Sequence, residues 1–170
     1  MRGGRATTFR LVVLALALRG LLGANCGGGE SRTWVALVPD ASSVEAYSLF
    51  TVEILVTSPT PIQAFELGLQ WDPEMLEPVN VAPHPDFDDD GAFFTSPQYD
   101  LTAGTLDRLV DLRHGGEGAE GSFNIATVEF LSLGAPGATS IGLTSGGLAD
   151  GNGNEPSLTS VVPVTITIEP

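Results

Sequence analysis

The residues of this chain whose types and spacing suit chemistry are mostly carboxylates and amides in short segments. In the run from Asp150 to Asn154, an oxygen-bearing side chain occurs at every second position, and glycines lie between them. Such oxygens bind hard cations such as calcium, and glycines let the backbone wrap closely. Asp150, Asn152 and Asn154 are therefore candidate calcium ligands. The alternative is a hairpin turn, which Gly and Asn also favour.

Other acidic residues offer weaker candidates. The run Asp86–Asp90 could also bind calcium, although such a charge run is more typical of a solvated loop. Asp107 and Asp111 could imitate the carboxylate pair of a glycosidase, but carboxylates are so frequent here that coincidence accounts for the pair. No Ser/His/Asp set is apparent either. We therefore expect a protein that is not an enzyme.

The start of the chain predicts export. Arginines precede the apolar run Leu11–Leu18, which is too short to span a bilayer, so 1–25 is expected to be a signal peptide. Cys26 is the only cysteine, which excludes an intramolecular disulfide. The residues before it resemble a bacterial lipoprotein signal, which implies that Cys26 is lipidated. The alternative is a secretory signal cut near Ala24. The glycine-rich residues 26–32 would form a flexible tether.

The chain is strongly acidic, with a formal net charge of −14 and no lysine. Beyond residue 25, three arginines, Arg32, Arg108 and Arg113, face 21 acidic residues. A surface of this charge repels nucleic acid and anionic membranes. We therefore expect no nucleic-acid partner, and contact with a membrane only through a lipid anchor. The charge is also that of a surface that keeps an exported protein soluble.

Apolar residues alternate with polar ones through most of 33–170, which predicts one all-β domain. The two prolines of Ser58–Pro61 indicate a turn. Residues 82–103 form a long irregular segment whose aromatic residues suggest that part of it packs against the domain. A change of parity near Ala126 indicates a β-bulge. The expected strands are 34–38, 49–56, 62–71, 76–81, 104–113, 123–133, 139–143 and 161–168. Eight or nine short strands without a helical period predict a two-sheet sandwich.

Two of these strands define a candidate surface by their alternation. In 62–71, the residues expected in the core are Phe65, Leu67, Leu69 and Trp71. In 104–113, the expected core set is Leu106, Arg108, Val110 and Leu112. The face that this assignment leaves open consists of Glu66, Gly68 and Gln70 on one strand and Asp107, Leu109, Asp111 and Arg113 on the other.

Five segments together resemble a cohesin-type domain in their order and spacing. They are Phe50–Ile54, Ile62–Leu76, Gly104–Leu106, Gly121–Phe130 and Leu148–Gly153. Cohesin-type domains are nine-stranded jelly-roll sandwiches, related to cellulose-binding modules, that bind dockerin modules on other proteins. The resemblance implies an all-β, two-sheet jelly roll of about nine strands. It also implies a non-catalytic, extracellular module that docks a dockerin-like partner through a sheet face.

If this resemblance holds, the open face described above is where the partner docks. Leu109 would then be an apolar anchor surrounded by charged residues. The alternative for these residues is an ordinary solvated sheet face. The alternative for the whole domain is a carbohydrate-binding module of the same fold, in which Phe94 or Tyr99 would contact a polysaccharide.

Overall fold

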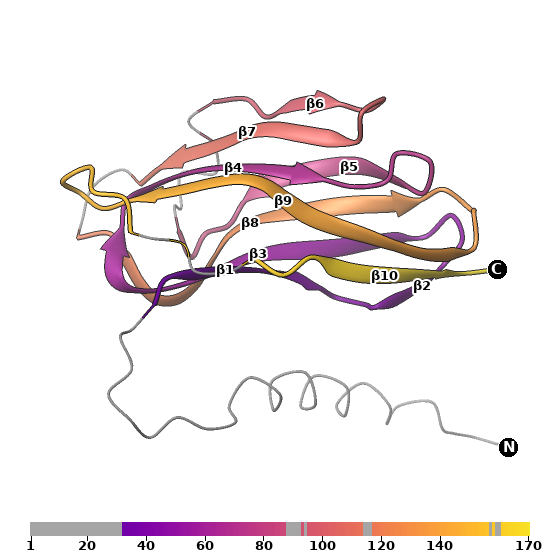
Figure 1. Ribbon diagram of the computed structural model, residues 1–170, viewed down its shortest axis with the longest axis horizontal. Helices are drawn as coiled ribbons and strands as arrows, with labels where there is room; N and C mark the ends of the chain where they lie inside the picture. Colours follow the sequence, from indigo (N-terminus) through magenta and orange to yellow (C-terminus); the bar gives the residue numbers. More distant parts are fainter. Residues whose placement is uncertain (1–31, 88–92, 94, 114–116, 157, 159–160) are drawn as a thin grey trace, which may run out of the picture. The chain divides into compact units, whose positions relative to one another are not determined.

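Strands build the domain, and the part of the chain that the structure describes contains no helix. The computed structural model describes residues 32–87, 93, 95–113, 117–156, 158 and 161–170. The strands are β1 (Trp34–Pro39), β2 (Ser43–Glu45), β3 (Leu49–Ile62), β4 (Ala64–Gln70), β5 (Leu76–Pro83), β6 (Gln98–Asp100), β7 (Thr105–Leu112), β8 (Ala119–Ser132), β9 (Gly137–Ala149) and β10 (Val164–Glu169) (Figure 1). No described segment is an apolar helix of membrane-spanning length.

The strands form two sheets. One has four strands in the order β1-β3-β8-β5, and the other has six in the order β2-β10-β9-β4-β7-β6. All pairings between these strands are antiparallel except that of β10 with β2, which is parallel. The predicted two-sheet sandwich is therefore confirmed. The two short strands β2 and β6, with three residues each, were not expected.

The core lies between the sheets and is built from alternate residues of both. In β3, the buried apolar residues are Phe50, Val52, Ile54, Val56 and Ile62. Phe130 of β8 stacks on Phe50, and it meets Trp71 edge-on, with ring centroids 5.7 Å apart in each pair. Trp71 is 3% exposed, so its predicted place in the core is confirmed. Burying each large apolar side chain stabilises the fold by roughly 1.5–3 kcal/mol.

The predicted turn at Ser58–Pro61 is wrong, because β3 continues through it to Ile62. The pairing of β3 with β8 skips from Ser58↔Gly121 to Ile62↔Ala119. Both prolines thus occupy positions outside the regular ladder, where their missing N–H groups cost little. The predicted bulge near Ala126 is confirmed, since a register shift leaves Ile125 as the extra residue.

Part of the long segment 82–103 packs against the core, as its aromatic residues suggested. Phe87 is 1% exposed. The centroid of its ring lies 5.1 Å from that of the Phe65 ring and 6.1 Å from that of the Phe123 ring. The candidate calcium residues Asp88–Asp90 of this segment lie outside the described residues, as do Phe94 and Cys26.

Candidate functional site

β4 is the central element of the candidate site, because it pairs with β9 on one side and with β7 on the other. Its start follows the buried end of β3, and its end is fixed by the Asp72-Pro73 turn. There the Asp72 carboxylate accepts a hydrogen bond from the Glu74 N–H at 2.9 Å, and the Asp72 carbonyl accepts one from the Leu76 N–H at 2.9 Å. An aspartate followed by a proline favours a turn of this kind.

Two expected members of the open face, Leu109 and Asp111, instead point into the sandwich. Leu109 is 0% exposed and Asp111 is 1% exposed. The prediction that both lie on the outside is wrong because β7 contains a bulge. Leu67 pairs with Leu109 and Leu69 pairs with Leu106, so two residues of β7 oppose the single residue between them on β4. An extra residue in one strand reverses the parity of everything beyond it.

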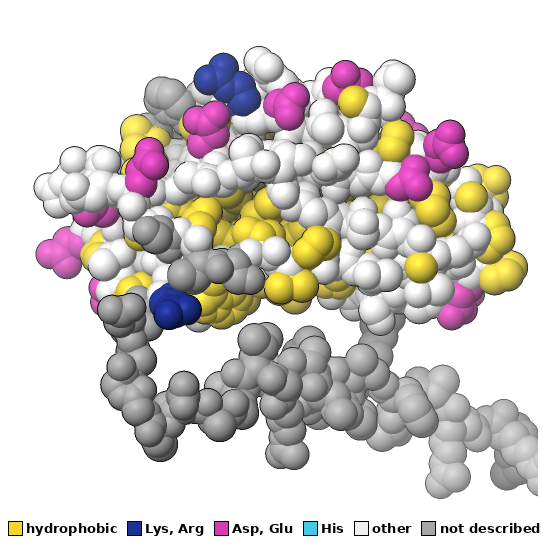
Figure 2. Space-filling model, viewed as in Figure 1, with side chains coloured by type: hydrophobic (Ala, Val, Ile, Leu, Met, Phe, Trp, Pro, Cys, Tyr) yellow, Lys and Arg dark blue, Asp and Glu magenta, His cyan; other side chains and the backbone are white. Residues whose placement is uncertain are grey.

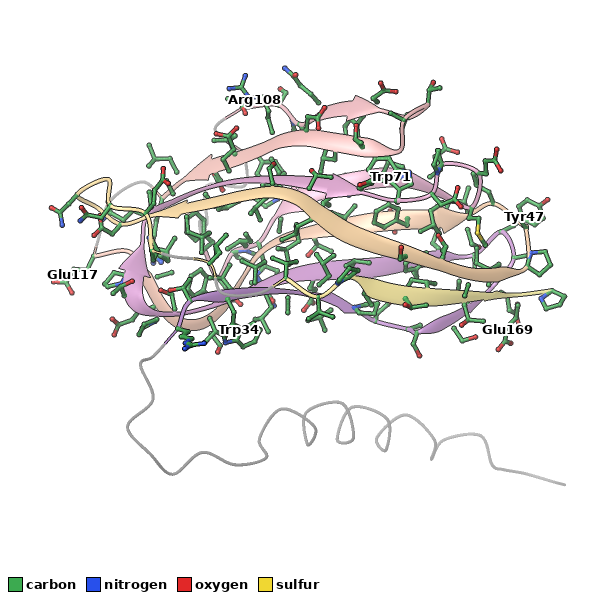
Figure 3. All side chains as sticks on the ribbon, in the orientation of Figure 1. Trp34, Tyr47, Trp71, Arg108, Glu117 and Glu169 are labelled. Atoms are coloured by element: carbon green, nitrogen blue, oxygen red, sulfur yellow. The ribbon has the colours of Figure 1, made fainter. Side chains whose placement is uncertain are left out.

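Arg108 is one of the two residues of β7 that oppose Gly68, and its backbone adopts a φ of +62°. This left-handed conformation is uncommon outside glycine and is typical of bulges and turns. The side chain was expected in the core, but it is exposed and projects from β7 away from the strands (Figure 3). Its Nε lies 3.7 Å from Oε1 of Glu66, and both side chains are mostly exposed. Such a pair contributes little stability.

Gly68 was also expected on the open face, yet it is buried. A Cβ atom on it would lie 2.5 Å from Oγ1 of Thr144 and 2.8 Å from Oγ of Ser145. β9 bulges here as well, because Gly68 pairs with Ser145 and Leu69 with Leu143. Glycine at this position therefore gives the bulged strand β9 the room it needs beside β4.

The side of the six-stranded sheet that faces away from the core is called the outer face below. Glu66, Gln70 and Asp107 lie on it and are exposed, as predicted. Arg113, the last predicted member, follows the end of β7 and is half-buried. The residues of β4, β7 and β9 that form the outer face are Ala64, Glu66, Gln70, Thr105, Asp107, Arg108, Val110, Leu112, Gly142, Ser145, Gly147 and Ala149.

A groove runs along this outer face where β4, β7 and β9 lie side by side. It has a volume of about 430 Å³. The residues that line it are Ala64, Phe65 and Glu66 of β4, Val110 of β7, Ser145–Ala149 of β9, and Glu155. A second hollow of about 220 Å³ lies beyond Glu66 and Val110 and is lined by Thr95, Gln98 and Arg108 as well. Sequence reasoning missed Val110 and Glu155, although the three-residue spacing of Leu106 and Leu109 could have revealed the bulge.

The Asp150 turn adjoins β9 and is closed by its own hydrogen bonds. Oδ1 of Asp150 accepts from the N–H groups of Asn152 and Asn154, both at 2.8 Å, and Oδ2 accepts from the Asn154 side-chain amide at 2.8 Å. These bonds, first of all that from the Asn154 side chain, lower the pKa of Asp150. The described residues hold no group of three His, Cys, Asp or Glu placed for a metal ion. Calcium at this turn stays a prediction.

Comparison with known proteins identifies the family. The cohesin domain model matches residues 35–169, so the chain belongs to the cohesin domain family. No curated protein matches the sequence. Among solved structures, a type II cohesin domain from the cellulosome of Acetivibrio cellulolyticus has a TM-score of 0.62 at 19% identity, covering 79% of this chain and 95% of its own.

Two further structures have the same fold. A type I cohesin–dockerin complex from Clostridium thermocellum gives a TM-score of 0.66 at 16% identity, covering 86% of this chain and 99% of the matched chain. A non-cellulosomal cohesin from the hyperthermophilic archaeon Archaeoglobus fulgidus gives a TM-score of 0.66 at 15% identity, and the match covers 82% of this chain and 93% of the matched chain. At these identities, the likeness establishes the fold and not the partner.

Proposed function

We propose that this domain is a non-catalytic binding module whose outer face docks a dockerin-like module on another protein. The observation that carries the proposal is the cohesin domain match, which spans nearly all of the described domain. The matched Clostridium structure is itself a complex of a cohesin with a dockerin. In this chain, the outer face combines a groove with partly exposed apolar side chains, Val110 and Leu112, and charged side chains around them. That composition suits a specific protein interface.

A titration of the full-length chain against a panel of dockerin modules, with calcium present, tests this function. We expect at least one module to bind, and Val110→Asn to weaken it strongly, because the substitution replaces an apolar contact in the middle of the outer face with a polar group that must lose water on docking. Val79→Asn is the matched control, since Val79 of β5 belongs to the other sheet and is 54% exposed. Absence of binding to every module, or equal weakening by both substitutions, would contradict the proposal.

Polysaccharide is the alternative ligand, and the described aromatic residues do not favour it. A sugar platform needs exposed aromatic rings in a row. Tyr99 of β6 is 44% exposed, but it pairs with Leu106, whose side chain points into the core. Among the described residues of the outer face, no other aromatic side chain is exposed. Retention of the full-length chain on insoluble cellulose, lost on Tyr99→Ala, would favour the alternative.

The export predictions belong to the same proposal. Residues 1–25 would direct secretion, Cys26 would carry the lipid, and residues 26–32 would tether the domain that occupies 33–170. The support is the pattern of arginines, apolar residues and a lone cysteine in the sequence. Incorporation of labelled palmitate into the expressed chain, abolished by Cys26→Ser, would support a surface anchor, whereas an unlabelled secreted chain would leave an ordinary signal peptide.

A further inference from the structure

The groove on the outer face has a floor of unusually small residues. Ala64 of β4 pairs with Ala149 of β9, and Glu66 pairs with Gly147. A Cβ atom on Gly147 would meet nothing within 4 Å, so the space above this residue is open. The volume of about 430 Å³ is near the lower end of the roughly 300–1,000 Å³ that is typical of ligand pockets. The groove can therefore admit a single long side chain but is too small for a whole helix.

Carboxylates set the charge of this groove. Glu66 on β4 and Glu155 beyond the Asp150 turn line it, and both are exposed. None of its described lining residues is basic. Arg108 contacts Glu66 from the second hollow, so it does not occupy the groove. The remainder of the domain is acidic as well. Figure 2 shows acidic side chains spread over the upper edge and the two ends of the domain, and few basic ones.

An apolar floor with carboxylates beside it matches the two parts of a long basic side chain. Arginine and lysine lay their methylene stems along apolar surface and keep the cationic head at its polar margin. A guanidinium also forms strong, directed hydrogen bonds to carboxylates. Glu66 already contacts Arg108 at its outer side, but a neutral apolar side chain in the groove would leave Glu155 without a counter-charge, and an acidic side chain would be repelled.

We propose that this groove receives one arginine or lysine side chain of the docking partner, with its stem on the floor of Ala64, Gly147 and Ala149 and its cation beside Glu66 and Glu155. This inference rests on the proposed function, because the basic side chain belongs to the module that docks on the outer face. It adds the chemistry by which the partner is recognised. A partner with a neutral residue at this point would bind less tightly.

The chemistry of the groove can be tested without knowing the partner. The full-length chain, labelled with ¹⁵N, is titrated with the peptide acetyl-Gly-Arg-Gly-amide and with the same peptide carrying citrulline, which is nearly isosteric with arginine and uncharged. We expect the arginine peptide to shift the amide signals of Gly146, Gly147 and Ala149, and high salt to remove the shift. Equal shifts with citrulline, shifts spread over the whole surface, or no shift in the groove would overturn the inference.

Two variants of Gly147 separate occupancy of the groove from effects on folding. Gly147→Ala adds a methyl group in open space, and Gly147→Leu fills the groove with a branched side chain. We expect the peptide-induced shifts to remain with alanine and to vanish with leucine, while both variants keep the wild-type spectrum elsewhere. Shifts that persist in a folded Gly147→Leu protein would place the peptide outside the groove and overturn the inference. If the leucine variant does not fold, the double variant Glu66→Gln, Glu155→Gln tests the inference in its place.

The double variant Glu66→Gln, Glu155→Gln then links the groove to the partner. Both side chains are exposed, so the fold should tolerate the change. Loss of charge-assisted contacts should weaken a bound dockerin module by about 10- to 100-fold. A module that binds this variant as tightly as the wild type would overturn the inference and leave the proposed function standing. If no module binds but the arginine peptide fills the groove, the proposed function fails and the chemistry of the groove stands.

Discussion

The outward faces of the two sheets differ in how their side chains are satisfied. On the four-stranded sheet, side chains of the neighbouring strands β3 and β8 form hydrogen bonds. The Asn124 amide donates to the Glu53 carboxylate at 3.1 Å, and the hydroxyls of Thr57 and Ser122 lie 2.9 Å apart. On the six-stranded sheet, Nε of Arg108 lies 3.7 Å from Oε1 of Glu66, and both side chains are mostly exposed. A groove lies over Gly147 of the same sheet. On the first face these contacts join side chains of neighbouring strands, whereas the second face carries a groove that offers a surface for a partner.

The bulges in β7 and β9 determine which residues face outward on the six-stranded sheet. Both occur beside Gly68 of β4, and each adds a residue that changes which side chains face outward. The four-stranded sheet also has register shifts, in its β3–β8 and β5–β8 pairs, and only its β1–β3 pair is regular throughout. Bulges are frequent near functional sites because they redirect side chains. The predictions below, in order of decreasing effect, test whether the two faces differ as described.

Leu109→Ala should have the largest effect on stability and none that is specific to docking. The side chain is fully buried, so its truncation should lower the free energy of unfolding by about 2–5 kcal/mol. Val110→Ala, one residue away on the outer face, should cost about 1 kcal/mol or less and reduce partner binding. Urea unfolding of both variants checks this. Similar stability losses would mean that the bulge of β7 is misplaced.

Gly68→Val tests the bulge of β9. Because its Cβ atom would meet the hydroxyls of Thr144 and Ser145, the variant should lose about 1–3 kcal/mol of unfolding free energy. Gly147→Ala on the neighbouring strand is the matched control and should be nearly neutral, because nothing surrounds the added methyl group. Thermal unfolding of the pair measures the difference. A neutral Gly68→Val variant would show that β9 leaves more room beside β4 than described here.

Asn124→Ala tests the outward face of the four-stranded sheet. Removing the amide that donates to Glu53 should cost about 0.5–1.5 kcal/mol, as expected for one partly buried hydrogen bond. Binding of a dockerin module should be unchanged. Urea unfolding and a binding titration of the same preparation measure the two effects. Weaker binding with unchanged stability would indicate that the four-stranded sheet takes part in docking.

Asp150→Asn should have the smallest effect, and one that depends on pH. Hydrogen bonds hold the pKa of Asp150 in the folded protein below its unfolded value, so the ionised carboxylate stabilises the turn at neutral pH. That contribution is present above the unfolded pKa and is lost as the pH falls through the lower folded pKa. The melting temperatures of wild type and variant should differ slightly at pH 7 and converge only as the pH falls below the folded pKa of Asp150. Addition of calcium at pH 7 tests the predicted metal ligands in the same assay.

Alternation predicted the faces correctly wherever a strand is regular. In β10, Ile166 and Ile168 are buried and Thr165 and Thr167 are exposed, as the pattern required. In β4, the large apolar residues were correctly placed in the core, because side chains of this size and type are usually buried. Alternation does not reveal which strands are neighbours, so the strand order of the two sheets was not predicted.

The site was predicted less well than the fold, for two physical reasons. A bulge adds one residue without changing composition, so the parity of Leu109 and Asp111 was inverted while each residue type still looked plausible. The floor of the groove consists of glycine and alanine, whose side chains carry no polar group. β9 was accordingly predicted over 139–143 only, although it extends over Gly137–Ala149 and contributes that floor.

The most direct test of the docking face is to map a bound dockerin module on the ¹⁵N-labelled full-length chain by chemical-shift changes and amide exchange. The account predicts changes centred on β4, on the outward residues of β7 and on the half of β9 from Ser145 to Ala149, with β1 and β3 unaffected. Changes centred on the β1-β3-β8-β5 sheet, with the groove unperturbed, would contradict it.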